Sequence, residues 1–317
     1  MILRNNINIK TRIAPTPSGY LHLGNVFSFV ITWVLAKKSG GTVHLRIDDL
    51  DEARKRNVYI EDIFLTLDWL KLQVDSGPSG AEDFEKNFSQ KHRLDLYRNA
   101  LEKLKRMNSG LFSCDCSRSK IKRHSPDGQY PGFCRNTNNQ DQKGFALRIK
   151  TENPTAIHFQ DMLQGNLEID LYQEIRDFVI RKKDGLPAYQ LASLVDDMVD
   201  DVNLIVRGKD LLSSTAAQLF LAQKLNEEKF IQNRFLHHPL ILENPGDKMS
   251  KSHQSLSIKY LRESNVSSSS VFETIGKWMN LKAKKIDSIH ALLEAFEFQA
   301  LPKSAICPGD NVLGNTL

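Results

Sequence analysis

A strand, a proline- and glycine-rich turn and a helix follow one another near the start of the chain, and this order restricts the fold more than any other feature. Residues 7–14 alternate between apolar and polar side chains, as a half-buried strand does. Residues 15–19 (PTPSG) interrupt that pattern, and residues 26–38 are typical of a helix that ends at a pair of glycines. A second strand is predicted over residues 42–47. Two strands joined through a helix predict a parallel α/β sheet with its ligand at the carboxyl ends of the strands.

The later part of the chain predicts that this α/β domain is interrupted and then resumes. Residues 145–170 are rich in strand-forming side chains, whereas a helix over 189–199 and a strand over 202–206 return to the α/β pattern. Beyond residue 245 the chain is lysine-rich and helical, with residues 267–270 as a linker or a helix cap. We therefore predict an α/β fold: a Rossmann-type, doubly wound parallel sheet split by an insertion and followed by a short helical region. The expected boundaries are 1–95 for the first half of the catalytic domain, 96–185 for the insertion, 186–245 for the second half and 246–317 for the helical region.

Composition agrees with a globular protein and leaves its partners open. The 317 residues suffice for about two domains with their own cores. No apolar run approaches the ~18 residues of a membrane span, and the polar N-terminus has no signal-peptide core, so a cytoplasmic location is expected. The net charge of +5 permits binding to nucleic acid without requiring it.

The segment PTPSGYLHLGN, residues 15–25, predicts an anion site at the start of the first helix. Free backbone N–H groups and the positive end of the helix dipole favour an anion there. Gly24 allows an adenine or a ribose to lie close to the backbone, and His22 can donate a hydrogen bond to a phosphate oxygen. The alternative is a capped turn with a surface histidine.

The segment KMSKS, residues 248–252, places two lysines on a loop far along the chain. Two ammonium groups on a loop can neutralise charge on a triphosphate as pyrophosphate leaves. A solvated basic loop is the alternative. With the first segment, however, Lys248 and Lys251 describe two sides of one triphosphate site. The implied attack of a substrate carboxylate on the α-phosphate needs no side-chain nucleophile, which agrees with the absence of a Ser–His–Asp or Cys–His motif.

Three of the four cysteines, Cys114, Cys116 and Cys134, lie within a short segment of the predicted insertion. In a reducing cytoplasm such a cluster indicates metal ligands rather than disulfides. Zinc prefers four tetrahedral ligands, and His124 is the fourth ligand that the residues themselves suggest. Three buried cysteines without a metal are the alternative.

The order and separation of the two phosphate-binding segments resemble the HIGH and KMSKS signatures of class I aminoacyl-tRNA synthetases. Four blocks narrow this resemblance to glutamyl-tRNA synthetases: RIAPTPSGYLHLG (12–24), LRIDDLDEAR (45–54), AYQLASLVDD (188–197) and VRGKDLL (206–212). The resemblance implies that ATP is bound with Mg²⁺ and that glutamate is the amino acid. It assigns ATP binding to His22, Gly24, Asn25 and Lys251, and catalysis to His22, Lys248 and Lys251.

The same resemblance implies a glutamate pocket lined by Arg12, Ala14, Thr16, Asp48, Tyr189 and Arg207. A guanidinium binds a buried carboxylate in bidentate fashion, and glutamine would leave that guanidinium without its anion. The alternative for the two arginines is a pair of surface salt bridges. One position departs from the family pattern, because Asp48 stands where the family usually has a glutamate that holds the substrate amino group. Its side chain is one methylene shorter, so either the backbone lies closer or a water molecule bridges the gap.

The spacing Cys-x-Cys…Tyr-x3-Cys is similar to that of glutamyl-Q tRNA(Asp) synthetases, which implies one structural zinc ion bound by Cys114, Cys116, Tyr130 and Cys134. Only about 65 residues follow Ser252, so we expect no anticodon-reading helical domains. The implied partners are ATP, L-glutamate and a tRNA(Asp) whose anticodon loop carries queuosine, with the protein a monomer and no membrane involved. A compact enzyme that charges tRNA(Glu) and a non-catalytic RNA-binding paralogue are the alternatives. Lysines in residues 276–285 are candidates for phosphate contacts, or for an ordinary solvated face.

Overall fold

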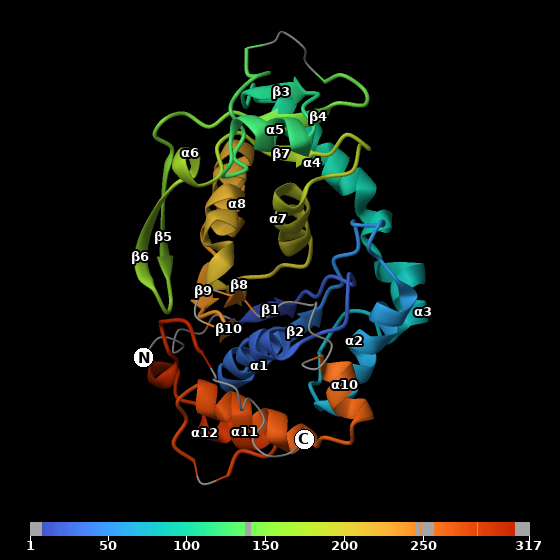
Figure 1. Ribbon diagram of the computed structural model, residues 1–317, viewed down its shortest axis with the longest axis vertical. Coiled ribbons are helices and arrows are strands. Elements are labelled where there is room, and N and C mark those ends of the chain that lie inside the picture. The colour runs from blue at the N-terminus through green and yellow to red at the C-terminus, as the bar shows by residue number, and fades with distance from the viewer. Residues whose placement is uncertain (1–7, 137–140, 245–246, 249–256, 284, 308–317) are drawn as a thin grey trace.

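The computed structural model describes residues 8–136, 141–244, 247–248, 257–283 and 285–307 (Figure 1). Its main sheet has six strands in the order β2-β1-β8-β9-β5-β6. Neighbours from β2 to β5 pair in parallel, and β6 pairs antiparallel with β5 as the second arm of a hairpin. The α/β class is thus confirmed, and the sheet is mixed rather than wholly parallel. The strands are β1 (Lys10–Ile13), β2 (Thr42–Leu45), β5 (Ala156–Asp161), β6 (Gly165–Asp170), β8 (Leu204–Gly208) and β9 (Arg234–His238).

The first helix, α1 (Leu23–Lys38), forms the centre of the core beside this sheet. It contacts β1, β2 and β8 on one side and α12 (Ile289–Ala295) on the other. Its apolar residues therefore surround the helix instead of forming one stripe, as expected of a helix that is buried on all sides. The predicted helix over 26–38 is confirmed and begins three residues earlier.

A three-stranded antiparallel sheet lies at one end of the long axis (Figure 1). It consists of β3 (Leu111–Cys114), β4 (Ala146–Ile149) and β7 (Phe178–Arg181), and α5 (Arg118–His124) lies beside it. The long helix α4 (Leu94–Arg106) runs from the middle of the molecule toward this sheet. These elements carry the cysteines and the segment predicted to be an insertion.

A second apolar core joins the two sheets. It is formed by α4 together with α7 (Tyr189–Val199) and α8 (Leu212–Leu225), whose buried leucines and phenylalanines pack against β5 and β9. The short helices α6 (Leu171–Glu174) and α9 (Glu228–Ile231) lie beside α8. Helices α2 (Asn57–Trp69) and α3 (Ala81–Asp83) lie on the side of β2, and the buried residues of α2 belong to the first core, with α1 (Figure 1). The predicted helix over 189–199 is confirmed at both ends.

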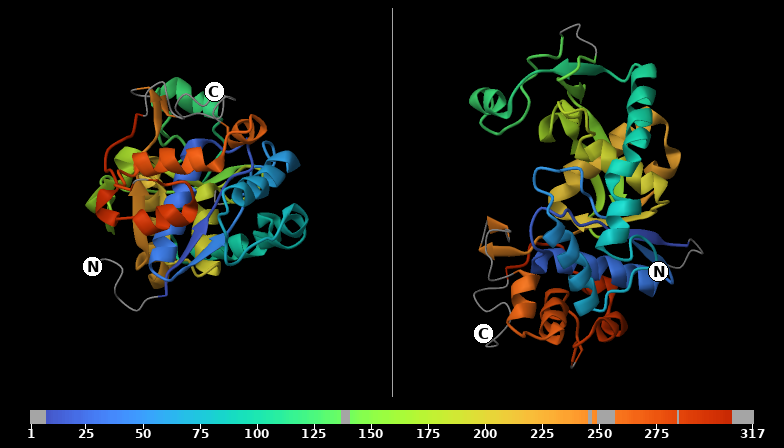
Figure 2. Two further views of the ribbon diagram at one scale, coloured as in Figure 1. Left: turned by 90° about the horizontal axis from the view of Figure 1, so that it is seen from below. Right: turned by 90° about the vertical axis from the view of Figure 1, so that its right-hand side faces the viewer.

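Helices α10 (Ile258–Glu263), α11 (Ser268–Trp278) and α12 pack at the opposite end of the long axis, which confirms the predicted helical region for the described residues (Figures 1 and 2). The Ser267 side chain accepts a hydrogen bond from the backbone N–H of Ser270, so this serine is a helix cap. None of the helices in the described ranges has the length and apolar character needed to cross a membrane.

The β5–β6 hairpin shows where sequence periodicity was insufficient. Both strands come from within residues 96–185, yet they extend the six-stranded sheet, because Asp161 pairs with Phe235 of β9. Alternation along a strand identifies a hairpin but does not say which sheet edge it joins. The segment predicted as an insertion therefore contributes both to its own small sheet and to the main one.

Candidate active site

A cavity of about 460 Å³ opens where β1 and β8 end and α1 begins. These strands are parallel neighbours, so their carboxyl ends meet at one edge of the sheet, as the sequence predicted. Nine of the residues predicted to bind ATP or glutamate line it: Arg12, Ala14, Thr16, His22, Gly24, Asn25, Asp48, Tyr189 and Arg207. Lys251 and the side chain of Lys248 lie outside the described residues.

The start of α1 forms one wall of the cavity. His22 is the residue before the helix, and its backbone N–H donates to Oδ1 of Asn25 at 3.1 Å. A Cβ atom added to Gly24 would lie 3.0 Å from Cε1 and Nδ1 of the His22 ring, so the glycine is what allows the imidazole to lie over the helix start. This arrangement presents an imidazole and free helix N–H groups to the same space, which suits a phosphate.

Both described ends of the segment that contains Lys251 lie beside this wall. Ser257 pairs with His22 in an antiparallel bridge, and the backbone N–H of Ile258 donates to the carbonyl of Leu21 at 2.7 Å. On the other side, β10 (Leu242–Asn244) pairs with β11 (Asp247–Lys248), directly after the cavity-lining Ile241. The two segments predicted to bind phosphate thus converge through their neighbours on one cavity.

Arg207 forms the charged wall at the end of β8. Its side chain is buried, at 4% exposure, and Nη2 donates to Oε1 of Gln218 at 2.8 Å. Nε and Nη1 make no hydrogen bond within the described part of the chain. Burial lowers the pKa of Arg207, while the nearby Tyr189 phenol opposes that shift. A buried guanidinium with two free donor groups beside a cavity is an arrangement that an anionic ligand would complete.

A buried network of charges lies beneath the cavity and joins its arginines. Oδ1 of Asp197 accepts from Nε of Arg12 at 2.8 Å and from Nη1 of Arg46 at 2.6 Å. Arg46 in turn donates through Nε to Oδ1 of Asp48 at 2.7 Å. Burial raises the pKa of the Asp48 carboxyl, although Arg46 opposes this shift. Burial acts in the same direction on Asp197, but Arg12 and Arg46 outweigh it and hold the pKa of Asp197 below its ordinary value.

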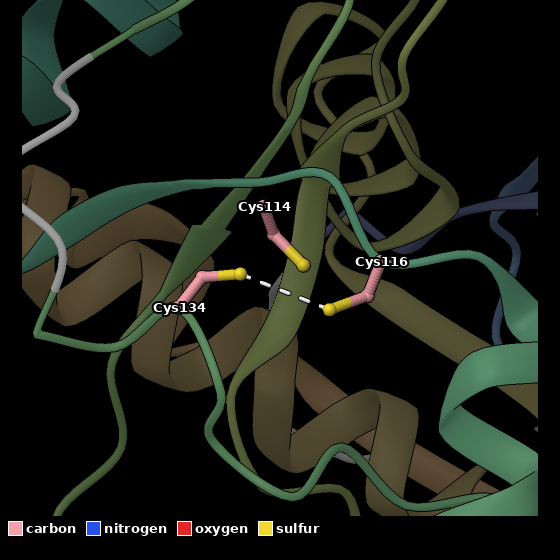
Figure 3. Close-up of side chains that lie close together, drawn as sticks. All are labelled: Cys114, Cys116 and Cys134. Carbon is pink, nitrogen blue, oxygen red and sulfur yellow. Dashed lines mark hydrogen bonds between the residues drawn. The ribbon is translucent and has the colours of Figure 1, made fainter.

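The cysteine cluster lies at the other end of the molecule, on the small antiparallel sheet. Figure 3 shows Cys114, Cys116 and Cys134 with their sulfur atoms turned toward one another. The three Sγ atoms lie within 4.8 Å of one another, and those of Cys116 and Cys134 are 3.7 Å apart. The Tyr130 hydroxyl accepts a hydrogen bond from the backbone N–H of Cys134 at 2.7 Å. This cluster is therefore a preassembled group of soft ligands.

Comparison with known proteins decides the family. The model of the family described as tRNA synthetases class I (E and Q), catalytic domain, matches residues 8–305. The chain belongs to this synthetase family.

Relatives within the family carry two kinds of name. The chain is 40% identical over 246 residues to the glutamyl-Q tRNA(Asp) synthetase of Pseudomonas putida, a match that covers 77% of this chain and 76% of that protein. It is 34% identical over 276 residues to the enzyme of that name from Nitratidesulfovibrio vulgaris, with 83% and 84% covered. It is 30% identical over 328 residues to glutamate–tRNA ligase 2 of Syntrophus aciditrophicus, covering 98% of this chain and 66% of that protein.

A solved structure supports the fold. The glutamate–tRNA synthetase of Elizabethkingia anophelis superposes with a TM-score of 0.77 at 22% identity, covering 95% of this chain and 68% of that one. The mixed sheet and its helices are thus those of the class I synthetase catalytic fold.

In this synthetase, Gly24→Ala is expected to raise the KM for ATP about tenfold without loss of stability, because a displacement of a few tenths of an ångström misplaces His22. Alanine is the better helix former, so the fold itself is retained. Steady-state kinetics and a thermal melt check both statements. Gly80→Ala is the matched control, since no heavy atom lies within 4 Å of the added Cβ there. An unchanged KM for ATP in the Gly24 variant would separate this glycine from nucleotide binding.

The geometry of the cysteine cluster fits a zinc ion. Zn–S bonds of about 2.3 Å in a tetrahedron place two sulfurs about 3.8 Å apart, close to the separation of Cys116 and Cys134. Burial raises the pKa of Cys116 to about 12, and the neighbouring Cys114 adds to that shift. A bound cation would lower the free-energy cost of forming the Cys116 thiolate. His124 is exposed and its Nδ1 bonds to the Lys120 carbonyl. Tyr130, in contrast, is buried in the same small core as the cluster cysteines.

Cys116→Ser is expected to lower the bound zinc from about one ion per chain to well below half, because a tetrahedral structural site needs all of its ligands. Metal analysis of the purified protein measures this ratio. Cys307→Ser is the control, since Cys307 is exposed and lies outside the cluster. Equal zinc content in wild type and the Cys116 variant would exclude the site.

Sequence reasoning missed Asp197 and Arg46. Both lie in sequence blocks that match the family, but neither residue is assigned a role by those blocks. The available signal was the pair of acidic residues Asp196 and Asp197 on an otherwise apolar helix, since buried carboxylates require cationic partners. Which cations they pair with depends on β1 and β2, which lie far away in the chain.

Proposed function

We propose that this protein activates L-glutamate with ATP to form glutamyl-adenylate and transfers the glutamyl group to queuosine in the anticodon loop of tRNA(Asp). The observation that carries the glutamate assignment is Arg207, a buried guanidinium with two free donor groups on the wall of a cavity beside the start of α1. A neutral side chain such as that of glutamine would leave this cation without a counter-ion, which provides discrimination without editing.

Within this proposal, the cavity wall formed by Arg12, Ala14, Thr16, Tyr189 and Arg207 takes the glutamate side chain. Asp48 lines the same cavity and is held by Arg46, so its second oxygen is the candidate partner for the substrate ammonium group. Burial already favours the neutral form of Asp48, and a cationic substrate group would favour the carboxylate. The shorter aspartate therefore remains compatible with amino-acid binding.

The adenylation step uses the substrate's own nucleophile. An oxygen of the glutamate α-carboxylate attacks the α-phosphorus of ATP, a new P–O bond forms, and the bond to pyrophosphate breaks with its electrons leaving on that group. His22 and the start of α1 stabilise charge on the phosphates, and Lys248 and Lys251 are proposed to neutralise the leaving pyrophosphate. Mg²⁺ accompanies ATP, bound mostly by phosphate oxygens and water, and supplies further charge neutralisation.

The similarity of the relatives supports the proposed acceptor. Proteins named glutamyl-Q tRNA(Asp) synthetase match at 34–40% identity, whereas those named glutamate–tRNA ligase match at 28–30%. The latter matches extend over 93–98% of the chain, so charging of tRNA(Glu) is the second candidate.

We further propose one structural zinc ion at Cys114, Cys116, Tyr130 and Cys134, and a monomer that acts in the cytoplasm, where tRNA is found. The boundaries at residues 95, 185 and 245 are retained as proposed divisions of the synthetase.

The test separates activation from transfer. ATP–pyrophosphate exchange is measured with glutamate and no RNA, and then with glutamine and aspartate. Labelled glutamate is next offered with tRNA(Asp) that carries queuosine, with the same tRNA lacking queuosine, and with tRNA(Glu). We expect glutamate-specific exchange without RNA and transfer only to the queuosine-containing tRNA. Absence of exchange under every condition would overturn the proposal, and charging of tRNA(Glu) alone would establish the second candidate.

A further inference from the structure

The end of the molecule that carries the cysteine cluster also presents an aromatic and cationic face that the adenylation chemistry does not use. We propose that α5 and Phe133 form an RNA-binding face, on which an unpaired base stacks against Phe133 while the cations of α5 contact the adjacent phosphates. This inference rests on the proposed function, because it names the surface through which the enzyme holds its RNA substrate. We call this set, Lys120, Lys122, Arg123, His124 and Phe133, the α5 face.

Phe133 is the first element of the α5 face. Its side chain is 44% exposed, and no other phenylalanine of the described ranges is among the exposed large apolar residues. The His124 ring meets it edge to face, with ring centroids 5.0 Å apart, and Nζ of Lys120 lies 5.6 Å from its centroid. An exposed ring that is held by a second ring and flanked by a cation is a suitable platform for a nucleobase.

The charge of α5 is the second element. Arg118, Lys120, Lys122 and Arg123 are all exposed, and none of them forms an ion pair with the residues that the structure describes. Three other cations of this region do have partners, because Arg181 and Lys105 pair with Asp141 and Arg135 pairs with Glu152. Uncompensated cations beside an aromatic ring match a polyanion that also carries rings, which is the chemistry of RNA.

The α5 face is preformed because α5 is anchored to the cysteine cluster. Ile121 lies on the opposite side of the helix from solvent and packs in a small core with Phe112, Tyr130 and the cluster cysteines. Ser117 caps the helix by accepting a hydrogen bond from the N–H of Lys120. A surface ordered in advance binds with less loss of conformational entropy, so metal binding at the cluster would support RNA binding at the face.

The position of α5 agrees with an extended substrate. In the right-hand view of Figure 2, α5 projects from the upper end of the molecule, to the same side as the β10–β11 hairpin that follows the cavity-lining Ile241. An RNA substrate that contacts both α5 and the cavity would lie along this side of the molecule. The helical end with α11 lies at the opposite end of the long axis and offers a comparison surface.

The experiment uses the full chain loaded with zinc. Binding of a fluorescently labelled tRNA(Asp) anticodon stem-loop is followed by anisotropy for wild type, Phe133→Ala, Phe133→Tyr and the triple variant Lys120→Gln/Lys122→Gln/Arg123→Gln. We expect about tenfold weaker binding for Phe133→Ala and near wild-type binding for Phe133→Tyr, because stacking needs the ring rather than its identity. Three lost phosphate contacts should lower the slope of log affinity against log salt by about 2 in the triple variant.

Matched controls remove similar groups elsewhere. Leu65→Ala removes another exposed apolar side chain. Lys277→Gln/Lys282→Gln/Lys285→Gln removes three exposed cations at the opposite end of the molecule, the other candidates for phosphate contacts, and we expect stem-loop binding to be unchanged in this variant. Zinc content and the thermal melt of each variant show whether it is folded, and Phe133→Tyr keeps the test valid if the alanine variant loses its metal.

These experiments test glutamate activation and RNA binding separately. ATP–pyrophosphate exchange without RNA should be unchanged in every variant of the α5 face. Wild-type stem-loop affinity in all these variants would overturn the inference and leave the proposed activity intact. Equal weakening toward anionic vesicles or an acidic protein would also overturn it, because the face would then be a general anion surface. If wild type lacks exchange activity altogether, the proposed function fails, and the anisotropy titrations still decide whether the face binds RNA.

Discussion

Arg207→Met is expected to raise the KM for glutamate by about 100- to 5000-fold, because removal of one partner from a buried charge pair costs about 3–5 kcal/mol. The guanidinium lies beside the cavity with Nε and Nη1 free, so the anion of the substrate would supply the missing partners. The KM for ATP should change little, since the nucleotide wall is formed by α1. Glutamate-dependent pyrophosphate exchange at varied concentrations of each substrate measures both constants.

The same substitution is expected to weaken glutamate binding without lowering the stability of the protein. Without substrate, Arg207 is a buried cation whose pKa is lowered by burial, so methionine at this position should leave the melting temperature unchanged or raise it. Glutamate should then no longer shift the melt. Arg234→Met is the matched control, because Arg234 begins β9 at the amino end of the sheet, away from the cavity. A variant with an unchanged KM for glutamate would remove Arg207 from the binding site.

Asp197→Asn is expected to lower the free energy of unfolding by about 3–5 kcal/mol at neutral pH, because two buried arginines lose the carboxylate that they share. Asp197 is fully buried, and its Oδ1 accepts from both Arg12 and Arg46. Asparagine keeps the shape of the side chain and removes only its charge, so packing is preserved. Urea unfolding followed by tryptophan fluorescence measures the loss, and the KM for glutamate should rise because Arg12 is no longer held.

The loss of unfolding free energy caused by Asp197→Asn should become smaller as the pH falls. Burial raises the pKa of Asp197, but Arg12 and Arg46 outweigh it, so the folded-state pKa lies below the ordinary value. The stabilisation is therefore complete above the unfolded-state pKa of about 3.9 and is lost as the pH falls through the lower folded-state value. The difference between wild type and variant should be largest near neutral pH and should shrink below about pH 4. Asp201→Asn, an exposed change just after α7, is the control and should show no such dependence.

Local patterns predicted the elements that carry the site. Helix α7 was predicted with both of its bounds, and the strand, turn and helix at the N-terminus were placed to within three residues. Of the nine cavity-lining residues, seven were carried over from the family resemblance, whereas His22 and Gly24 were predicted from the local chemistry of a helix start. Such predictions succeed because capping, periodicity and backbone freedom act over a few residues.

Contacts between distant segments could not be predicted in the same way. The β5–β6 hairpin joined the main sheet instead of remaining with the small one, and Asp197 paired with Arg12 of β1 and with Arg46, the residue directly after β2. In both cases the partner lies far away in the chain, and alternation or charge alone does not identify it. The choice between His124 and Tyr130 belongs to the same class, since it depends on how α5 packs.

The sequence by itself determined the α/β class and the family, and it placed the proposed nucleotide site at the start of α1, because each depends on short motifs. Tertiary structure alone decided that Nε and Nη1 of the buried Arg207 make no hydrogen bond among the described residues, that Asp197 joins Arg12 to Arg46, and that Asp48 is held from behind by Arg46. These are properties of burial and of pairing across the sheet. The physical reason is that a charge acquires its energetic meaning only when the surroundings that replace water around it are known.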